Sequence, residues 1–187
     1  MPDLAPLSAL GAETPGSIHT GRLVLREISD IALATLALRN GGTAPMPFGL
    51  VLPGPLGWNP GNLAGAFWIA PGQWMISADG RAHTDFACDL KSAAPDCAVT
   101  EQTDGWAVFE IVSPEGAAPI GNLLERIVNL DPRILNAGAA TRTHMAHMSV
   151  FLVRPADDRL TILGMRSAAA SLWHALLEAV RGISAHG

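Results

Sequence analysis

The chain has 187 residues, a net charge of −5 and two cysteines, so it is the size of one domain and lacks the cysteines of a disulfide framework. With 12 Lys and Arg and no run of about 18 apolar residues, it predicts neither nucleic-acid binding nor a membrane span. The N-terminus lacks the cationic and apolar segments of a secretory signal, so we expect a cytoplasmic protein.

The chain is short of charge. Asp, Glu, Lys and Arg make up 16% of its residues and apolar residues 49%, whereas about 25% charged residues is usual. Two explanations stay open. Base composition is one, because Lys91 is the only lysine. The other is that a partner protein covers part of the surface, so that this part never meets water.

The first third of the chain predicts an arm, two strands and a long loop. Residues 1–20 show no hydrophobic period, so we expect a flexible or partner-bound arm before a single domain over 21–187. Alternating apolar residues predict strands from Arg22 onward and over Ile31–Leu38. The segment 40–65 is so rich in Gly and Pro that we expect a loop without regular elements.

The rest of the chain interleaves strands and helices. We predict one hairpin over 66–77, turned at Pro71-Gly72, and another over 99–112, turned at Asp104-Gly105. Because hairpins require antiparallel pairing, the fold class is α+β, with antiparallel sheets and packed helices. The remaining predicted elements are helices over 81–92 and 117–128, strands over 144–153 and 160–165, and a last helix that Ser167 caps and Gly182 ends.

No motif predicts a self-sufficient active site. The Gly-rich segment contains no GxGxxG or GxxxxGK[ST] phosphate motif, and no GxSxG occurs anywhere. His144 and His147 fall on a predicted strand, where positions i and i+3 face opposite sides. His83, Asp85 and Cys88 have no second pair to complete a zinc site. We therefore predict no catalytic, cofactor-binding or metal-binding residue on this chain.

Five tryptophans and no tyrosine point instead to a binding surface or to core packing. Trp is enriched at protein interfaces because it buries a large area and keeps one donor. Arg166 could pair with a partner carboxylate, or with Glu27 or Glu110 inside the fold. Our candidate subunit-interface residues are Trp68, Trp74, Trp106 and Arg166.

Four segments, in this order, resemble a known family. Residues 68–76 resemble W-L-G-P-x-E-W-L-L, residues 99–106 resemble V-T-D-Q-S-D-G-W, residues 109–114 resemble L-x-L-S-G-P, and residues 166–173 resemble R-S-x-A-x-S-L-W. Together they resemble the gamma subunit of heterotetrameric sarcosine oxidase, over about residues 22–182.

The resemblance implies the fold of the first part of the glycine-cleavage aminomethyltransferase, and an accessory, structural subunit without a cofactor of its own. It also implies alpha, beta and delta partner subunits that carry FAD, FMN, NAD, tetrahydrofolate and zinc. Such a complex, an oxidoreductase, converts sarcosine to glycine, hydrogen peroxide and either formaldehyde or methylene-tetrahydrofolate.

Three alternatives stay open. The chain could be the equivalent subunit of a related complex, such as N-methylglutamate dehydrogenase. It could be a stand-alone, folate-binding aminomethyltransferase-like protein. A small-molecule binding module built on the long loop rests on loop length alone.

Overall fold

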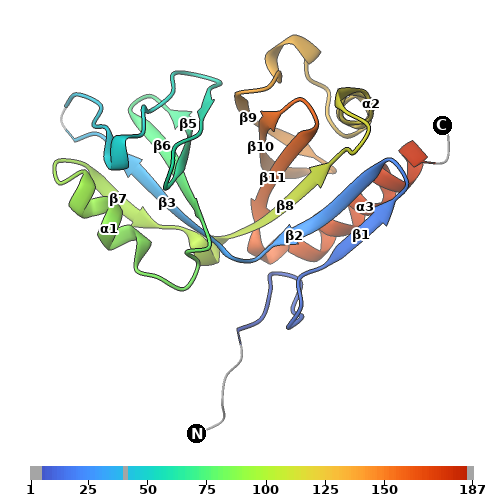
Figure 1. Ribbon diagram of the computed structural model, residues 1–187, viewed down its shortest axis with the longest axis horizontal. Coiled ribbons are helices and arrows are strands. Elements are labelled where there is room, and N and C mark those ends of the chain that lie inside the picture. Colours follow the sequence, from blue (N-terminus) through green and yellow to red (C-terminus); the bar gives the residue numbers. More distant parts are fainter. Residues whose placement is uncertain (1–5, 40–41, 185–187) are drawn as a thin grey trace, which may run out of the picture.

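The computed structural model describes residues 6–39 and 42–184. Two antiparallel sheets diverge from a common crossing point, and helices cover them on their outer faces (Figure 1). The predicted α+β class, with antiparallel sheets and packed helices, is confirmed.

The larger sheet has six strands and carries two helices. In spatial order its strands are β1 (Ser17–Thr20), β2 (Leu23–Ile28), β8 (Trp106–Val112), β11 (Arg159–Met165), β10 (Met148–Ala156) and β9 (Ala139–Met145). Helices α2 (Ala117–Ile127) and α3 (Ala169–Ser184) pack on one face of this large sheet. Leu172, Leu176 and Val180 recur every four residues of α3 and are fully buried there, each stabilising the fold by about 1.5–3 kcal/mol.

The smaller sheet has five strands and one helix. Its strands, in spatial order, are β4 (Trp58–Asn59), β5 (Gly65–Ala70), β6 (Gln73–Asp79), β3 (Ile31–Ala37) and β7 (Ala98–Glu101). Helix α1 (Phe86–Ala93) covers its outer face, with Phe86 and Leu90 buried against the sheet. The Asp85 carboxylate caps this helix by accepting a hydrogen bond from the Cys88 amide at 3.1 Å.

The two sheets are joined along both sides. At the crossing point, which we call the waist, the chain passes from β2 to β3 and later from β7 to β8 (Figure 1). At the opposite edges the Trp58 amide donates to the Gly138 carbonyl at 2.9 Å and the Ala140 amide to the Leu56 carbonyl at 2.8 Å, so β4 meets β9. A third core fills the space between the sheets, with Leu33, Phe67, Val108 and Leu163 among its buried residues.

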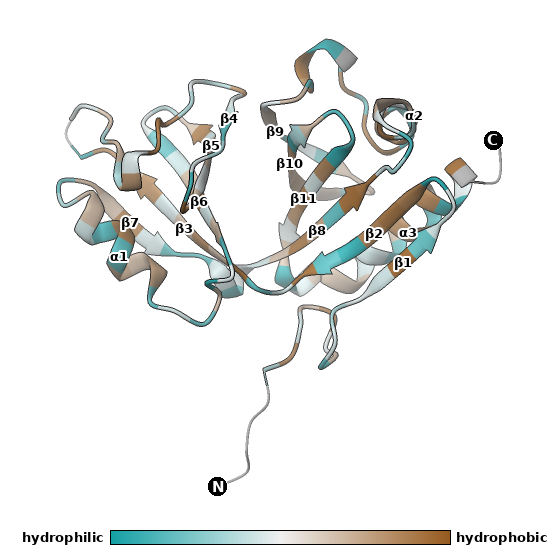
Figure 2. Cartoon of the chain, in the orientation of Figure 1, coloured by the Kyte–Doolittle hydropathy of each residue, from teal (hydrophilic) through white to brown (hydrophobic). Residues whose placement is uncertain are grey.

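Several predicted elements are confirmed. The hairpin over 66–77 is β5 and β6, which place Trp68 opposite Trp74. Helix 117–128 is α2, and strands form at β2, β3 and β11 close to their predicted bounds. Figure 2 shows hydrophilic residues interrupting the hydrophobic run of β2, where Arg26 and Glu27 follow Leu25.

The second predicted hairpin is wrong. Strand β7 pairs with β3 in the small sheet, whereas β8 pairs with β2 and β11 in the large one. Between them residues 103–105 form a 3-10 turn, in which the Gly105 amide donates to the Gln102 carbonyl. The turn at Asp104-Gly105 therefore sends the chain across the waist and does not fold it back.

Three boundaries also differ from the prediction. Residues 17–20 of the expected arm form β1, because they pair with β2 from Ser17 to Thr20, while residues 1–5 lie outside the described chain. The predicted strand over 144–153 is broken at Ala146-His147, whose positive φ angles (46° and 66°) turn β9 into β10. Ser167 lies in a 3-10 turn and does not cap α3, which continues past Gly182 to Ser184.

The segment 42–65 has little regular structure, as predicted. It contains a 3-10 turn at Pro47–Gly49, the two-residue strand β4 and, at Gly65, the first residue of β5, while residues 40 and 41 of the predicted loop lie outside the described chain. Phe48 and Leu56 adopt positive φ angles of 55° and 60°, which L residues with side chains rarely do. The segment thus follows a specific path against the small sheet.

Candidate functional site

A cleft of about 500 Å³ lies between the two sheets. Its walls come from β2, β8 and β11 of the large sheet and from β3, β5 and β6 of the small one, and residues 60–65 form a lip on the small-sheet side. This volume falls in the range of ligand pockets, about 300–1,000 Å³. The cleft is therefore the main candidate site.

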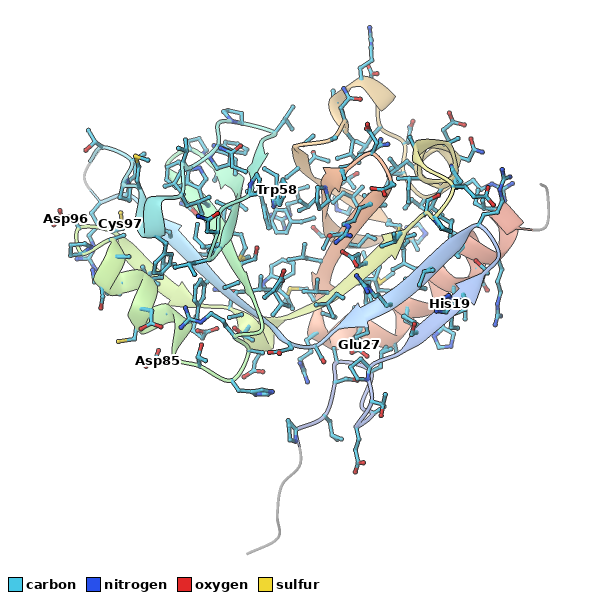
Figure 3. The ribbon with its side chains drawn as sticks, in the orientation of Figure 1. His19, Glu27, Trp58, Asp85, Asp96 and Cys97 are labelled. Atoms are coloured by element: carbon cyan, nitrogen blue, oxygen red, sulfur yellow. The ribbon has the colours of Figure 1, made fainter. Side chains whose placement is uncertain are left out.

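The floor of the cleft is apolar. Leu33 and Phe67 from the small sheet, and Val108 and Leu163 from the large sheet, belong both to the cleft lining and to the core between the sheets. The Trp58 side chain, labelled between the two sheets in Figure 3, adds an aromatic surface to the same wall. The floor can bury the body of an apolar group.

A buried carboxylate flanked by two guanidinium groups lies above this floor. Strand register places Arg26 opposite Glu110 and Glu110 opposite Thr161, so Arg26, Glu110 and Arg159 share the cleft face of the large sheet. Arg26 Nε donates to Glu110 Oε2 at 2.6 Å, and its Nη2 donates to the same oxygen. Arg159 Nη1 donates to Glu110 Oε1 at 3.1 Å.

The burial of these three side chains is unequal. The Glu110 side chain is 9% exposed, whereas those of Arg26 and Arg159 are 46% and 44% exposed. Two positive groups share one negative group, so the cluster carries a net positive charge that faces the mouth of the cleft. Such a cluster can hold an anion, because guanidinium groups match the geometry of a carboxylate.

The waist end of the cleft is acidic. Asp30 and Asp79 line it, and Ile31 pairs directly with Asp79 between β3 and β6. Asp30 Oδ1 accepts a hydrogen bond from the Ala82 amide at 3.3 Å. Neither carboxylate makes an ion pair within residues 6–39 and 42–184. The cleft therefore has a basic mouth and an acidic end.

In the described part of the chain, no group of three or more His, Cys, Asp or Glu lies close enough together to hold a metal ion. His144 and His147, which we considered as a pair, lie in β9 and in the turn that follows it. Within the same residues, no helix is long and apolar enough to cross a membrane.

The three candidate interface tryptophans differ in how deeply they are buried. Trp74 is only 6% exposed, and its Nε1 donates to the Pro53 carbonyl at 2.7 Å, so it holds the 42–65 segment onto the small sheet. We therefore remove it from the candidate interface. Trp68 and Trp106 are half-buried and keep part of their surface. The Trp106 ring packs against Phe151 with ring centroids 5.3 Å apart.

Arg166 is engaged by the arm. Its Nη2 donates to the carbonyls of Leu7 and Ser8, at 3.0 and 3.3 Å, above a hollow of about 360 Å³ at the waist. The prediction that Arg166 pairs with Glu27 or Glu110 is wrong. Glu110 binds the two cleft arginines, and Glu27 accepts from backbone amides of the arm.

Sequence reasoning missed the residues that form the cleft. The sequence pattern predicts a strand from Arg22 onward without singling out Arg26, and it suggests Glu110 only as a partner for Arg166. Trp58 was placed in the structureless loop. Alternation in β2 indicates which of its residues share a face. Nothing in the sequence sets the register that aligns β2, β8 and β11.

Comparison with known proteins supports the fold. No protein-family model matches the chain, and no curated protein matches its sequence. A chain of the heterotetrameric sarcosine oxidase from Corynebacterium sp. U-96, solved in complex with pyrrole 2-carboxylate, is similar with a TM-score of 0.72 and 21% identity, over 91% of this chain and 89% of that one.

The glycine cleavage system aminomethyltransferase T from Bartonella henselae is similar with a TM-score of 0.61 and 16% identity, over 86% of this chain. The match spans only 46% of the aminomethyltransferase, so the present chain corresponds to less than half of that protein. At these identities the likeness shows the fold, which is that of an aminomethyltransferase-like protein, as the sequence predicted.

Proposed function

We propose that this chain is an accessory subunit, of the gamma type, in a heterotetrameric flavin-dependent complex that oxidises sarcosine. The observation that carries the proposal is the mutual coverage with a chain of a heterotetrameric sarcosine oxidase, 91% of one and 89% of the other. Two chains that overlap almost completely are similar in length. The shared fold therefore extends over nearly all of both chains.

The exposed apolar side chains of the 42–65 segment support a role in an assembly. Met46, Val51, Leu56 and Leu63 are all large, apolar and exposed, and all four belong to this one segment. Contiguous exposed apolar surface marks sites that other proteins cover, and our proposal is that a partner covers part of this segment. The shortage of charge in the chain agrees with this explanation, alongside base composition.

In the proposed complex, this chain has a structural role. The alpha, beta and delta subunits would carry FAD, FMN, NAD, tetrahydrofolate and zinc, and this chain would hold none of them. The reaction would convert sarcosine, dioxygen and water to glycine, formaldehyde and hydrogen peroxide, or would pass the one-carbon unit to tetrahydrofolate. The chain would act on this reaction only through assembly of the complex.

A stand-alone folate-binding protein is the second candidate function. The cleft favours it, because the apolar floor suits a ring system and Arg26 and Arg159 suit a carboxylate. The match to less than half of aminomethyltransferase T argues against an equivalent complete site on this chain. Calorimetry of the purified chain with tetrahydrofolate distinguishes the two functions. A stand-alone folate-binding protein should bind tetrahydrofolate, and an accessory subunit should not.

Co-expression tests the leading proposal. The tagged chain is produced with candidate large flavoprotein subunits, and the purified material is assayed with sarcosine and with N-methylglutamate, both for hydrogen peroxide formation and for reduction of an artificial electron acceptor. We expect the flavoproteins to co-purify and sarcosine to be oxidised. Activity on N-methylglutamate alone would assign the chain to the related dehydrogenase-type complex. A chain that stays monomeric and does not co-purify with the flavoproteins would contradict the proposal.

A further inference from the structure

We propose that the cleft mouth is the docking site for a segment of a partner subunit that places a carboxylate between Arg26 and Arg159. The inference rests on the proposed function, because it names the surface by which the subunit would be held. Its occupant is a stretch of polypeptide with an acidic residue beside an apolar one.

The first argument is charge complementarity. Arg26 reaches Glu110 through Nε and Nη2, and Arg159 through Nη1. A guanidinium group has five N–H donors, so both arginines keep donors that Glu110 does not use. A second carboxylate between them would neutralise the net positive charge and accept those donors.

The second argument is that the cluster is held in place but not covered. Glu110 is buried and fixes one edge of each guanidinium group, while nearly half of each arginine side chain stays exposed. Charged pairs that a partner shields from water contribute more to binding than pairs that stay exposed at the rim. The arginines are therefore positioned for an interaction that the isolated chain does not make.

The third argument is the apolar lip across the mouth. Leu63 lines the cleft and is 63% exposed, so most of its surface is uncovered within the described chain. The lip is tightly turned, because a Cβ atom at Gly61 would lie 2.6 Å from the Ala64 carbonyl oxygen. An occupant that places its acid at Arg26 and Arg159 would also cover Leu63 with an apolar residue.

The acidic end of the cleft gives the occupant a direction. Asp30 and Asp79 repel a carboxylate at the waist end and would accept a Lys or Arg there. Two charged ends of opposite sign, with an apolar floor between them, suit several consecutive residues of a chain better than a single small carboxylate. This favours a polypeptide segment over a free metabolite.

The test compares variants in the co-expressed complex. In the triple variant R26Q/E110Q/R159Q all three charges are removed together, so no buried charge is left unpaired. We expect its affinity for the flavoproteins to fall by about tenfold or more, as for a buried charge pair at an interface. Asp79→Asn should weaken binding less, since it removes only one of the two carboxylates at the far end.

Arg133→Gln is the matched control, because Arg133 is 89% exposed and lies outside the cleft. Thermal unfolding of each purified chain shows that the variants fold. Equal affinity of the triple variant and the wild type would overturn this inference and leave the proposed function standing. Failure of the wild type to assemble would overturn both.

A titration of the isolated wild-type chain with acetate and with glutamate tests whether the cleft binds free carboxylates instead of a polypeptide. We expect neither to raise the melting temperature. A rise that the triple variant abolishes would identify a site for free carboxylates and would overturn the proposal of a polypeptide occupant.

Discussion

Arg26 and Glu27 are neighbours in β2, and their side chains serve opposite faces of the large sheet. Arg26 lines the cleft and binds Glu110, whereas Glu27, labelled in Figure 3, binds the N-terminal arm on the other face of the sheet. Strand alternation is the cause, since successive side chains point to opposite faces. One strand thus supports both the candidate site and the arm.

The arm should depend on Glu27. Its carboxylate accepts from the amides of Leu10 and Gly16 at 3.0 and 3.1 Å. Glu27→Ala should lower the free energy of unfolding by about 2 kcal/mol, because two part-buried amides lose their acceptor. Thermolysin should cut near Leu10 faster than in the wild type. Glu13→Ala, an exposed change on the same arm, serves as the control, and equal cleavage rates for the Glu27 variant and the wild type would refute the anchor.

Gly164 should be required for the packing of α3. A Cβ atom at this position would lie 2.4 Å from Leu172 Cδ2, so Gly164→Ala should destabilise the chain by about 1–3 kcal/mol through overpacking. Gly121→Ala in α2 is the matched control. Nothing lies within 4 Å of its Cβ position, and it should gain about 0.5–1 kcal/mol from reduced backbone entropy. Urea denaturation measures both, and similar values for the two variants would contradict this account.

The two cysteines should differ in reactivity. Cys88 is exposed, whereas Cys97 is buried and the pKa of its thiol is raised, first by burial and then by Asp96. Less thiolate therefore forms at Cys97 at about pH 8. Iodoacetamide should modify only Cys88 in the native chain and both thiols in urea, as mass spectrometry of the peptides reports. Modification of both in the native chain at equal rates is the contrary result.

Trp68 and Trp74 should behave differently although they are cross-strand neighbours. Trp68→Ala should weaken binding of the flavoproteins by about 2 kcal/mol if this half-buried ring lies at the interface. Trp74→Phe should instead lower the stability of the chain by about 1 kcal/mol, because the Pro53 carbonyl loses its donor. Affinity measurements and denaturation of the isolated chain separate the two effects. Unchanged affinity for the Trp68 variant would remove it from the interface.

The sequence predicts the elements of this fold better than it predicts their pairing. Alternating apolar residues predict β2 and β3, and the last helix is predicted close to the bounds of α3, because these signals are local. The pairing of β7 and β8 was wrong, since the turn between them leads to another sheet.

The candidate site depends on pairing alone, so it could not be predicted. Arg26 and Glu110 are 84 residues apart in the chain, and Glu110 and Arg159 are 49 apart. Only the register of β2, β8 and β11 places them on one face. Trp58 reaches the cleft because β4 pairs with β5, and a two-residue strand leaves no periodic signal.

The central claim is that this chain is one subunit of a sarcosine-oxidising complex. Native mass spectrometry of the complex purified through a tag on this chain tests it most directly. The account predicts one species that contains a single copy of the chain together with the flavoprotein subunits, and no substantial free monomer. A monomer, or an oligomer of this chain alone, in the presence of soluble flavoproteins would contradict it.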